Sequence, residues 1–348
     1  MYNAIDRLRR DRALPDGQMR ALLLCEDRDV LSYLFQQARR VREEAYGRAV
    51  FIRGLVEFTN HCKNDCYYCG IRRSNAQAQR YRLQEEQILQ CAQSGYRLGF
   101  RTIVLQGGED PFFTDEKMVS IIRGIKSQHP DCAVTLSIGE RPEKSYRAFF
   151  EAGADRYLLR HETADEAHYG LLHPAGMSFR HRMDCLKALK EIGFQTGCGF
   201  MVGSPYQTVD NLLSDLAFTA AFQPQMVGIG PFIPHRDTPF KDRAAGSALM
   251  TLKLLAIIRL LLPTVLLPAT TALNTLLPDG CEQGMLAGAN VVMPNLSPQG
   301  VRKKYMLYNN KASFGSEAAD ALDSLRARMP RIGYEVVCDR GDYRQPSC

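Results

Sequence analysis

From residue 51 onward, short apolar runs alternate with longer segments in which apolar residues recur every three or four positions. The short runs are typical of buried strands, and the longer period is typical of amphipathic helices. The pattern predicts strands at 51–58, 102–108, 132–138, 155–161, 197–203, 225–230, 264–271 and 290–295. It predicts helices between them at 84–97, 115–127, 142–152, 178–192, 208–222, 246–261 and 278–286.

Eight strands in strict alternation with helices favour parallel pairing and a closed (β/α)8 barrel, an α/β fold of the TIM type. A doubly wound open sheet is the alternative, but it usually has fewer strands and carries a Gly-rich phosphate loop at its first turn. In a barrel, the functional residues lie at the carboxyl ends of the strands.

The first residues form charged helices without strands. Segment 3–46 reads as three helices, with Asp16 and Asp27 as expected N-caps of the second and third. We therefore expect N-terminal helices that pack on the barrel (1–48), the barrel itself (49–310), and a C-terminal helix and tail (311–348).

Composition and charge limit the class of protein. The chain has 348 residues, 45% of them hydrophobic, and a net charge of +6 that is too small to indicate nucleic-acid binding. The N-terminus lacks the apolar core of a signal peptide. The most apolar stretch, 254–273, contains Arg259, Pro263 and Pro268 and is a poor membrane span. We expect a cytoplasmic protein without membrane contact.

Three of the eleven cysteines cluster after the first strand. Cys62, Cys66 and Cys69 form C-x3-C-x2-C in the loop TNHCKNDCYYCGIRR. Thiolates are the usual ligands of iron–sulfur clusters, and three of them leave the fourth iron of a 4Fe–4S cluster open. The main alternative is structural zinc, which needs four protein ligands. His61 is awkwardly placed to be the fourth, and Cys91 falls on a predicted helix.

This motif, with Tyr68 just before the last cysteine, resembles the radical S-adenosylmethionine (SAM) superfamily. The second strand ends in Gly107-Gly108-Glu109, which resembles the superfamily's GGE motif. The resemblance implies that SAM chelates the open iron and is cleaved by reduction to a 5′-deoxyadenosyl radical. It also implies that the GGE segment holds the methionine ammonium.

Within the superfamily, the strings YCGIRR, VLQGGEDP, VTLSIGE, GADRYLLRHETA, GIGPFIPH, LPATTAL and GANVVMPN resemble the HydE family of FeFe-hydrogenase maturases. They extend over nearly the whole predicted barrel. Biotin synthase and methylornithine synthase share the layout and remain alternatives that act on small organic substrates. An iron–sulfur carrier that does not cleave SAM is the alternative from another class.

The resemblance assigns further residues to SAM. It implies that Ser137, after the third strand, and Glu162, after the fourth, contact SAM, and that Arg182 pairs with its carboxylate. The alternative is that Glu162 and Arg182 only pair with each other across the barrel mouth.

A cavity below SAM is expected to bind a small anionic substrate. Arg160 would point into the barrel, where a guanidinium needs an anion. Thr270 and Thr271 would end the seventh strand at the same level. Met226 would offer an apolar wall, and Tyr305 and Tyr308 would cap the cavity. The resemblance implies a cysteine-bound iron carbonyl and cyanide unit as substrate.

The resemblance also implies partners: the tyrosine-lyase maturase, the GTPase scaffold maturase, and ferredoxin or flavodoxin as reductant. We expect one cluster only. Some relatives hold a second cluster with three cysteines after the eighth strand, but segment 296–337 here has none. Cys338 and Cys348 remain without an assigned role, as does His235.

Overall fold

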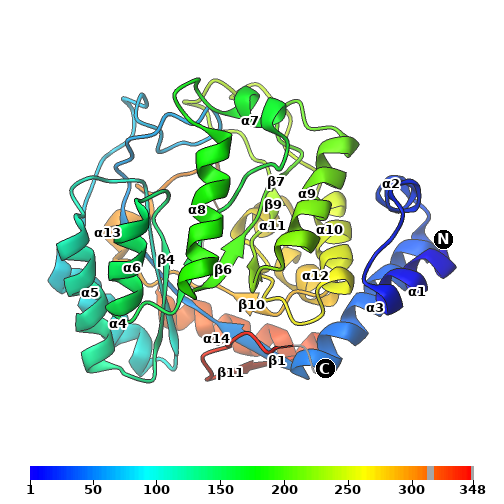
Figure 1. Ribbon diagram of the computed structural model, residues 1–348. Coiled ribbons are helices and arrows are strands. Elements are labelled where there is room, and N and C mark those ends of the chain that lie inside the picture. Colours follow the sequence, from blue (N-terminus) through cyan, green and yellow to red (C-terminus); the bar gives the residue numbers. More distant parts are fainter. Residues whose placement is uncertain (312–316, 346–348) are drawn as a thin grey trace.

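The computed structural model describes residues 1–311 and 317–345 (Figure 1). The helices are α1 (Tyr2–Asp11), α2 (Asp16–Leu24), α3 (Arg28–Tyr46), α4 (Glu85–Arg97), α5 (Asp115–Gln128), α6 (Glu143–Glu151), α7 (Glu166–Leu172), α8 (Phe179–Ile192), α9 (Val209–Phe222), α10 (Ala248–Leu261), α11 (Thr271–Leu276), α12 (Gly280–Leu286), α13 (Gln299–Arg302) and α14 (Ala318–Arg328), with a 3-10 turn at Met329–Ile332. The strands are β1 (Ala49–Ile52), β2 (Gly54–Thr59), β3 (Thr102–Gly107), β4 (Ala133–Ser137), β5 (Arg156–Leu158), β6 (Gln195–Cys198), β7 (Met201–Val202), β8 (Met226–Val227), β9 (Gly230–Pro231), β10 (Val291–Val292) and β11 (Glu335–Val337).

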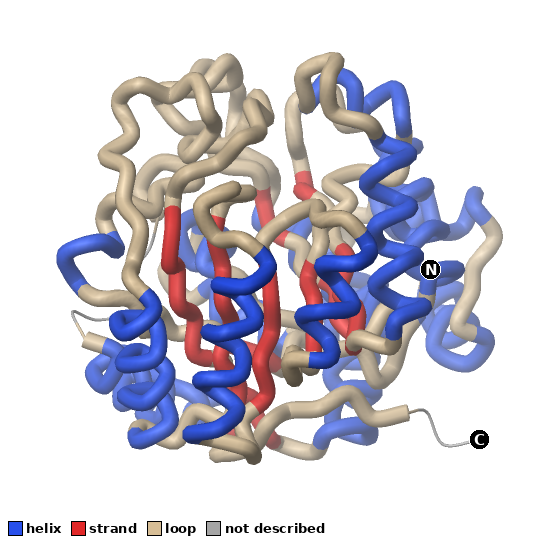
Figure 2. The backbone as a smooth tube through the Cα atoms, turned by 60° about the vertical axis from the view of Figure 1, so that its left-hand side comes forward, coloured by secondary structure: helices blue, strands red, loops and turns tan. Residues whose placement is uncertain are grey.

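The central sheet has the order β2-β3-β4-β5-β6-β8, and all neighbouring strands are parallel. Parallel neighbours need crossover connections, and here helices provide them on the outside of the sheet (Figure 2). The α/β class and the parallel strands are therefore as predicted. Single parallel bridges continue the pairing from β8 through segments 266–268 and 291–295 back to β2.

Several predicted strands are shorter or divided. The strand expected at 51–58 is two strands that meet at Arg53, and β1 pairs with β10 and β11 outside the central sheet. The strands expected at 197–203 and 225–230 are also each divided into two. Segment 264–271 makes only single bridges, because Pro268 has no backbone N–H to donate. We expected Thr271 to end a strand, but it is the first residue of α11.

Side chains alternate between the two faces of the central sheet. In β4, Val134 and Leu136 join the apolar core between sheet and helices, whereas Thr135 and Ser137 do not. In β2, Val56 and Phe58 belong to the same core. The alternation therefore sends polar residues such as Thr135 and Ser137 to the inner face of the sheet, together with apolar ones such as Leu55 and Val104.

Capping residues define many helix starts. Asp27 caps α3 as predicted, since its carboxylate accepts hydrogen bonds from the N–H groups of Asp29 and Val30. Asp16 was expected to cap the second helix, but it is the first residue of α2, and Pro15 occupies the N-cap position. Asp16 instead places a negative charge in the first turn, where the helix dipole favours it.

The buried helix α10 lies in the most hydrophobic segment of the chain. It is 14 residues long and packs against α3 and α1. Its Arg259 is fully buried and donates to the carbonyl groups of Gly288 and Pro263, at 2.8 and 2.7 Å. Burial lowers the pKa of Arg259 to about 9. Among the residues that the structure describes, no helix is both long and apolar enough to cross a membrane.

The C-terminal segment covers the end of the sheet opposite the loops that carry the cysteines (Figure 1). Strand β11 pairs with β1, and the chain then reaches Arg156, at the start of β5. The guanidinium of Arg156 donates to Asp342 at 2.6 Å and to the carbonyl of Arg340 at 3.0 Å. This end of the sheet is therefore closed by an ion pair between a fully buried guanidinium and a partly exposed carboxylate. Cys338 is exposed in this segment, and Cys348 lies outside the described residues.

Candidate functional site

The predicted cysteine cluster lies on a long loop between β2 and α4, which is at the upper left in Figure 1. The loop has little regular secondary structure, so side chains hold its shape. Arg80 donates to the carbonyl groups of Ile71 and Arg72, at 2.8 and 2.6 Å. Arg72 makes a two-pronged contact with Asp65, at 2.8 and 2.5 Å. These contacts fix the loop around the thiols without using the thiols themselves.

The three thiols lie in the interior of this loop. Burial raises the pKa of Cys69 to about 12, and it also raises the pKa of Cys62 and of Cys66. The charges of Cys69 and Cys62 add to the raised pKa of Cys66, and the charge of Cys62 adds to that of Cys69. The backbone N–H of Glu109 donates to Cys62 Sγ at 3.4 Å. The thiolates would therefore need positive partners.

The loop supplies three thiols for a metal site. Within residues 1–311 and 317–345, no group of three or more His, Cys, Asp or Glu side chains is arranged to hold a single metal ion. A structural zinc ion needs four protein ligands, one more than this loop supplies, whereas a 4Fe–4S cluster takes its thiolates on separate irons. Cluster ligation by the three cysteines stays a prediction.

The Gly107-Gly108-Glu109 segment ends β3 directly beside the cysteine loop. A Cβ atom on Gly108 would lie 2.2 Å from the carbonyl oxygen of His61 and 2.8 Å from Cys62 Cβ, so only glycine fits. Glu109 is 7% exposed. Its carboxylate accepts from the N–H of Glu140 at 2.9 Å and lies 3.2 Å from Lys63 Nζ.

Arg182 is the buried cation of this region. It forms an ion pair with Glu140, after β4, and donates to the carbonyl of Arg160 at 2.9 Å. The alternative pair of Arg182 with Glu162 does not form, since Glu162 contacts Arg160 instead. Burial alone would lower the pKa of Arg182, but Glu140 outweighs it and holds that pKa well above its usual value. Sequence reasoning missed Glu140, although it lies in the string VTLSIGE.

Comparisons with known proteins decide the family. The model of the radical SAM superfamily matches residues 56–219. The FeFe hydrogenase maturase subunit HydE of Thermotoga maritima is 45% identical over 293 residues, which cover 84% of this chain and 83% of that protein. The chain belongs to the HydE family of radical SAM proteins.

Other relatives of this HydE-family chain share its extent. The 3-methylornithine synthase of Methanosarcina acetivorans is 31% identical over 281 residues, which cover 80% of this chain and 79% of that protein. The crystal structure of methylornithine synthase PylB has a TM-score of 0.81 at 25% identity and covers 96% of this chain and 97% of that one. A crystal structure of HydG, a maturase of the FeFe-hydrogenase, has a TM-score of 0.79 at 22% identity and covers 95% of this chain and 74% of that one. This likeness shows a shared fold.

Tyr68 lies between the cysteines and α7. Its hydroxyl is 3.2 Å from Nε2 of His173, and the ring of His173 stacks on Tyr169 with centroids 3.9 Å apart. Burial lowers the pKa of His173 to about 3, so its imidazole is neutral at pH 7. His173, which sequence reasoning missed, therefore fixes the orientation of Tyr68 without adding a charge.

Ser137 and Glu162, the expected SAM contacts, lie at the carboxyl ends of neighbouring strands β4 and β5. Ser137 is the last residue of β4, beside Gln106 of β3. Glu162 has a φ of +67°, a left-handed conformation that is uncommon for a residue with a side chain. Its Oε2 atom lies 3.0 Å from Nη2 of Arg160, yet neither of these atoms makes an aligned hydrogen bond. Both therefore retain the capacity to bind a ligand.

The expected substrate residues are spread over several elements. Arg160 follows β5 by two residues, and its Nε atom is buried without a partner. Thr270 precedes α11 and has an unpaired, buried hydroxyl, whereas Thr271 lies within that helix. Met226, at the start of β8, is buried.

Two tyrosines follow the last strand of the central region. Tyr305 is 2% exposed, and its hydroxyl lies 3.4 Å from Gln106 on the inner face of β3. Tyr308 is partly buried, and burial raises the pKa of its phenol. The role of both tyrosines as caps of a cavity stays a prediction.

Arg53 is the residue that sequence reasoning missed most clearly. It is 5% exposed, and its Nη1 donates to the thioether Sδ of Met226 at 3.0 Å. Its Nε and Nη2 atoms have no hydrogen-bond partner, nor does the buried hydroxyl of Thr135. Because Arg53 falls inside an apolar run, the strand pattern hid it.

Proposed function

We propose that this protein is a radical SAM enzyme of FeFe-hydrogenase maturation. The observation that carries the proposal is the contact between the cysteine loop and the end of β3, where the N–H of Glu109 reaches Cys62 Sγ at 3.4 Å. This contact joins the ligands of a cluster to the segment that would hold SAM. The 45% identity with HydE of Thermotoga maritima supports the role in maturation.

Each of the residues beside the thiols has a proposed role. Cys62, Cys66 and Cys69 would hold one 4Fe–4S cluster, whose irons would stabilise the buried thiolates. When bound, the cluster and SAM supply a reductive cleavage that yields a 5′-deoxyadenosyl radical. Buried Glu109 suits the methionine ammonium of SAM. Arg182, which already pairs with Glu140, suits the carboxylate of SAM.

The remaining SAM residues complete this assignment. Tyr68 would pack beside the cluster, in the orientation that His173 sets. Ser137 and Glu162 would contact the nucleoside, and the unpaired Oε2 of Glu162 suits a ribose hydroxyl. The single bridges that link the two edges of the central sheet support a closed eight-stranded barrel around this site.

The proposed substrate is a small anion that binds on the inner face of the sheet. Buried guanidinium nitrogens of Arg53 and Arg160 lack hydrogen-bond partners, and so do the hydroxyls of Thr135 and Thr270. Buried polar groups are ordinarily paired, so these groups suit ligands with acceptor atoms. Arg160 follows β5, at the carboxyl ends of the strands, whereas Arg53 precedes β2 at their amino ends. A cysteine-bound iron carbonyl and cyanide unit has this chemistry. An organic amino acid, as for the 3-methylornithine synthases, is the second candidate, because those relatives also span 80% of the chain.

The proposed partners are the other two maturases, the tyrosine lyase and the GTPase scaffold. HydG, a maturase of the FeFe-hydrogenase, shares the fold of this chain. Ferredoxin or flavodoxin would supply electrons. An iron–sulfur carrier without SAM cleavage is the opposing hypothesis. It gives no role to buried Glu109 and Arg182 beside the thiols.

The test is reductive SAM cleavage by anaerobically reconstituted protein. With dithionite, we expect 5′-deoxyadenosine from the wild type and none from a variant with Cys62, Cys66 and Cys69 replaced by Ala. Replacement of buried Cys91 by Ala is the matched control and should retain both cluster and activity. Iron and sulfide should be about four of each per chain.

Three results would contradict the proposal. Product from the triple variant would show that the cysteines are not the cluster ligands. Iron near eight that falls to four in Cys338→Ser would contradict the single cluster. Wild-type protein that binds a cluster but never forms 5′-deoxyadenosine would support the carrier.

A further inference from the structure

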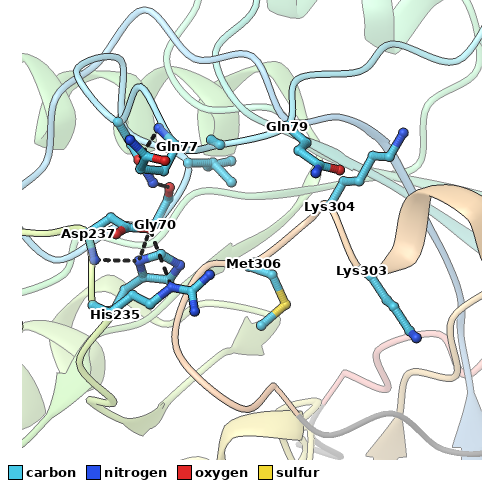
Figure 3. Close-up of a pocket in the computed structure, with 12 residues that line it drawn as sticks. Gly70, Gln77, Gln79, His235, Asp237, Lys303, Lys304 and Met306 are labelled. Atoms are coloured by element: carbon cyan, nitrogen blue, oxygen red, sulfur yellow. Dashed lines mark hydrogen bonds and ion pairs between the residues drawn. The ribbon is translucent and has the colours of Figure 1, made fainter.

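A pocket of about 310 Å³ opens on the outer side of the cysteine loop, away from the inner face of the sheet. Figure 3 shows His235 and Asp237 on one side of it, Gln77 and Gln79 on another, and Lys303 and Lys304 on a third. Three separate segments of the chain thus meet here. The pocket includes His235, to which sequence reasoning gave no role.

The floor of the pocket is the backbone that follows the last cysteine. Gly70 comes directly after Cys69, and a Cβ atom on it would lie 2.2 Å from the carbonyl oxygen of Met306 and 2.5 Å from the ring of His235. The N–H of Gly70 donates to the carbonyl of Leu307 at 2.8 Å. The pocket is therefore separated from the thiol of Cys69 by a single residue.

The same contacts tie the basic segment to the cysteine loop. The side-chain amide of Asn60, at the start of the loop, donates to the carbonyl of Lys304 at 2.7 Å. Together with the Gly70 contact, it holds segment 304–307 against the start and the middle of the loop. The backbone that carries Lys304 is thus fixed to the cysteine loop by one side-chain and one backbone hydrogen bond.

The rim of the pocket is positively charged. Within the described residues, neither Lys303 nor Lys304 pairs with a carboxylate. Arg236 is 82% exposed at its side chain, and its guanidinium lies 3.7 Å from Asp237, the pocket's one acidic residue. Three cations thus lie around one acidic residue, and among the residues that the structure describes only Arg236 has a carboxylate partner.

We propose that this pocket is the docking surface for an acidic one-electron carrier protein. The inference rests on the proposed function, which requires reduction of a cluster at the cysteine loop. Carboxylates of the carrier would lie against Lys303, Lys304 and Arg236. One electron leaves the reduced carrier and enters the cluster; no bond forms or breaks and no proton moves. Such encounters use small interfaces, and complementary charges mainly raise their association rate.

The test uses full-length, cluster-loaded protein and an acidic low-potential ferredoxin as the probe. In K303E/K304E, the dissociation constant for ferredoxin, measured by calorimetry at low ionic strength, should rise by at least about tenfold. The rate of cluster reduction by reduced ferredoxin should fall to match. Both differences should shrink at about 0.5 M salt, because salt screens exposed charges.

A matched control makes the same change of charge elsewhere. K144E/K187E alters two exposed lysines on α6 and α8, and it should bind and accept electrons from ferredoxin like the wild type. K303Q/K304Q removes charge without reversing it and should give a smaller loss. It keeps the test valid if K303E/K304E does not fold.

Dithionite separates this inference from the proposed function. It is a small reductant that needs no docking surface, so K303E/K304E should cleave SAM with dithionite at the wild-type rate. Failure of the wild type with dithionite would refute the proposed function instead. Unchanged ferredoxin affinity in the lysine variants, or an equal loss in K144E/K187E, would overturn the docking surface. Normal reduction by ferredoxin with lost hydrogenase activation would assign the surface to another maturase and would also overturn it.

Discussion

Replacement of Arg53 by Met is expected to stabilise the protein while it abolishes function. The Arg53 side chain is almost fully buried and reaches only the thioether of Met226, a weak acceptor. Burial lowers its pKa well below the usual value, and the nearby charge of Arg156 lowers it further. The charges of Tyr46 and Asp342 oppose this shift only in part, so without an anionic ligand the folded protein carries most of the desolvation penalty of a buried cation.

The magnitude follows from what the substitution removes. Met is nearly as long as Arg, so the change leaves little cavity, and it removes two unpaired buried nitrogens. Replacement of buried charges by apolar side chains of similar volume can stabilise a protein by about 1–4 kcal/mol. For a chain of this size, that corresponds to a rise of about 1–5 °C in melting temperature.

Arg156→Met is the matched control, because that guanidinium is equally buried but fully paired. It donates to Thr102 at 2.9 Å, to Gln195 at 3.1 Å and to Asp342 at 2.6 Å. Its loss leaves these acceptors without their donor. Since Asp342 is 40% exposed and keeps Arg340, we expect a destabilisation of about 2–3 kcal/mol.

The assay is thermal unfolding, followed by circular dichroism, of both variants without substrate, together with hydrogenase activation in the presence of the partner maturases. We expect opposite shifts in melting temperature and a loss of activation in Arg53→Met, with 5′-deoxyadenosine formation retained. If Arg53→Met melts below the wild type while Cys91→Ala does not, the guanidinium contributes net stability. The argument that it awaits an anion would then be wrong.

Two other changes test the cysteine loop and the closed end of the sheet. Gly108→Ala should lower cluster content at least about tenfold, because the new methyl group would displace the carbonyl of His61 beside the thiols. Gly176→Ala is the control, because a methyl group there meets no atom within 4 Å. A normal iron content in Gly108→Ala would contradict the close approach. Burial alone would raise the pKa of Asp342, but hydrogen bonds from its arginine partners lower it below its usual value, so its stabilisation is present above about pH 4 and is lost as the pH falls. Asp342→Asn should therefore lose about 1–2 kcal/mol at pH 7, allowing for its partial exposure, and vary less between pH 5 and pH 3 in denaturant titrations; an unchanged acid profile would contradict this assignment.

Features carried by local patterns could be predicted from the sequence. The helices between strands start and end within about two residues of their predicted bounds, because capping residues and apolar periodicity are both local. The position of the cysteine loop after a strand could also be predicted. The lack of a regular strand at 264–271 could not, since an apolar run does not show whether Pro268 leaves enough N–H donors for continuous strand pairing.

Pairings across the site could not be read from the sequence. Glu140 and Arg182 are 42 residues apart, and nothing in either segment indicates that they form an ion pair. The sequence offered Glu162 as a partner for Arg182 instead. The choice depends on the left-handed backbone at Glu162, which turns that carboxylate toward Arg160. Such geometry arises only when β5 and its neighbours are assembled.

Unpaired buried cations inside the sheet are themselves an argument for function. Between the sheet and the helices, residues such as Val134 and Leu136 form an apolar core. Arg53, which precedes β2, and Arg160, which follows β5, instead have buried nitrogens without hydrogen-bond partners, and Glu162 beside Arg160 has a left-handed backbone. Each such feature costs free energy of folding, and strain of this kind persists at functional sites. Anionic ligands that neutralise Arg53 or Arg160 would offset those costs, so the folded protein binds best what its own side chains leave unpaired.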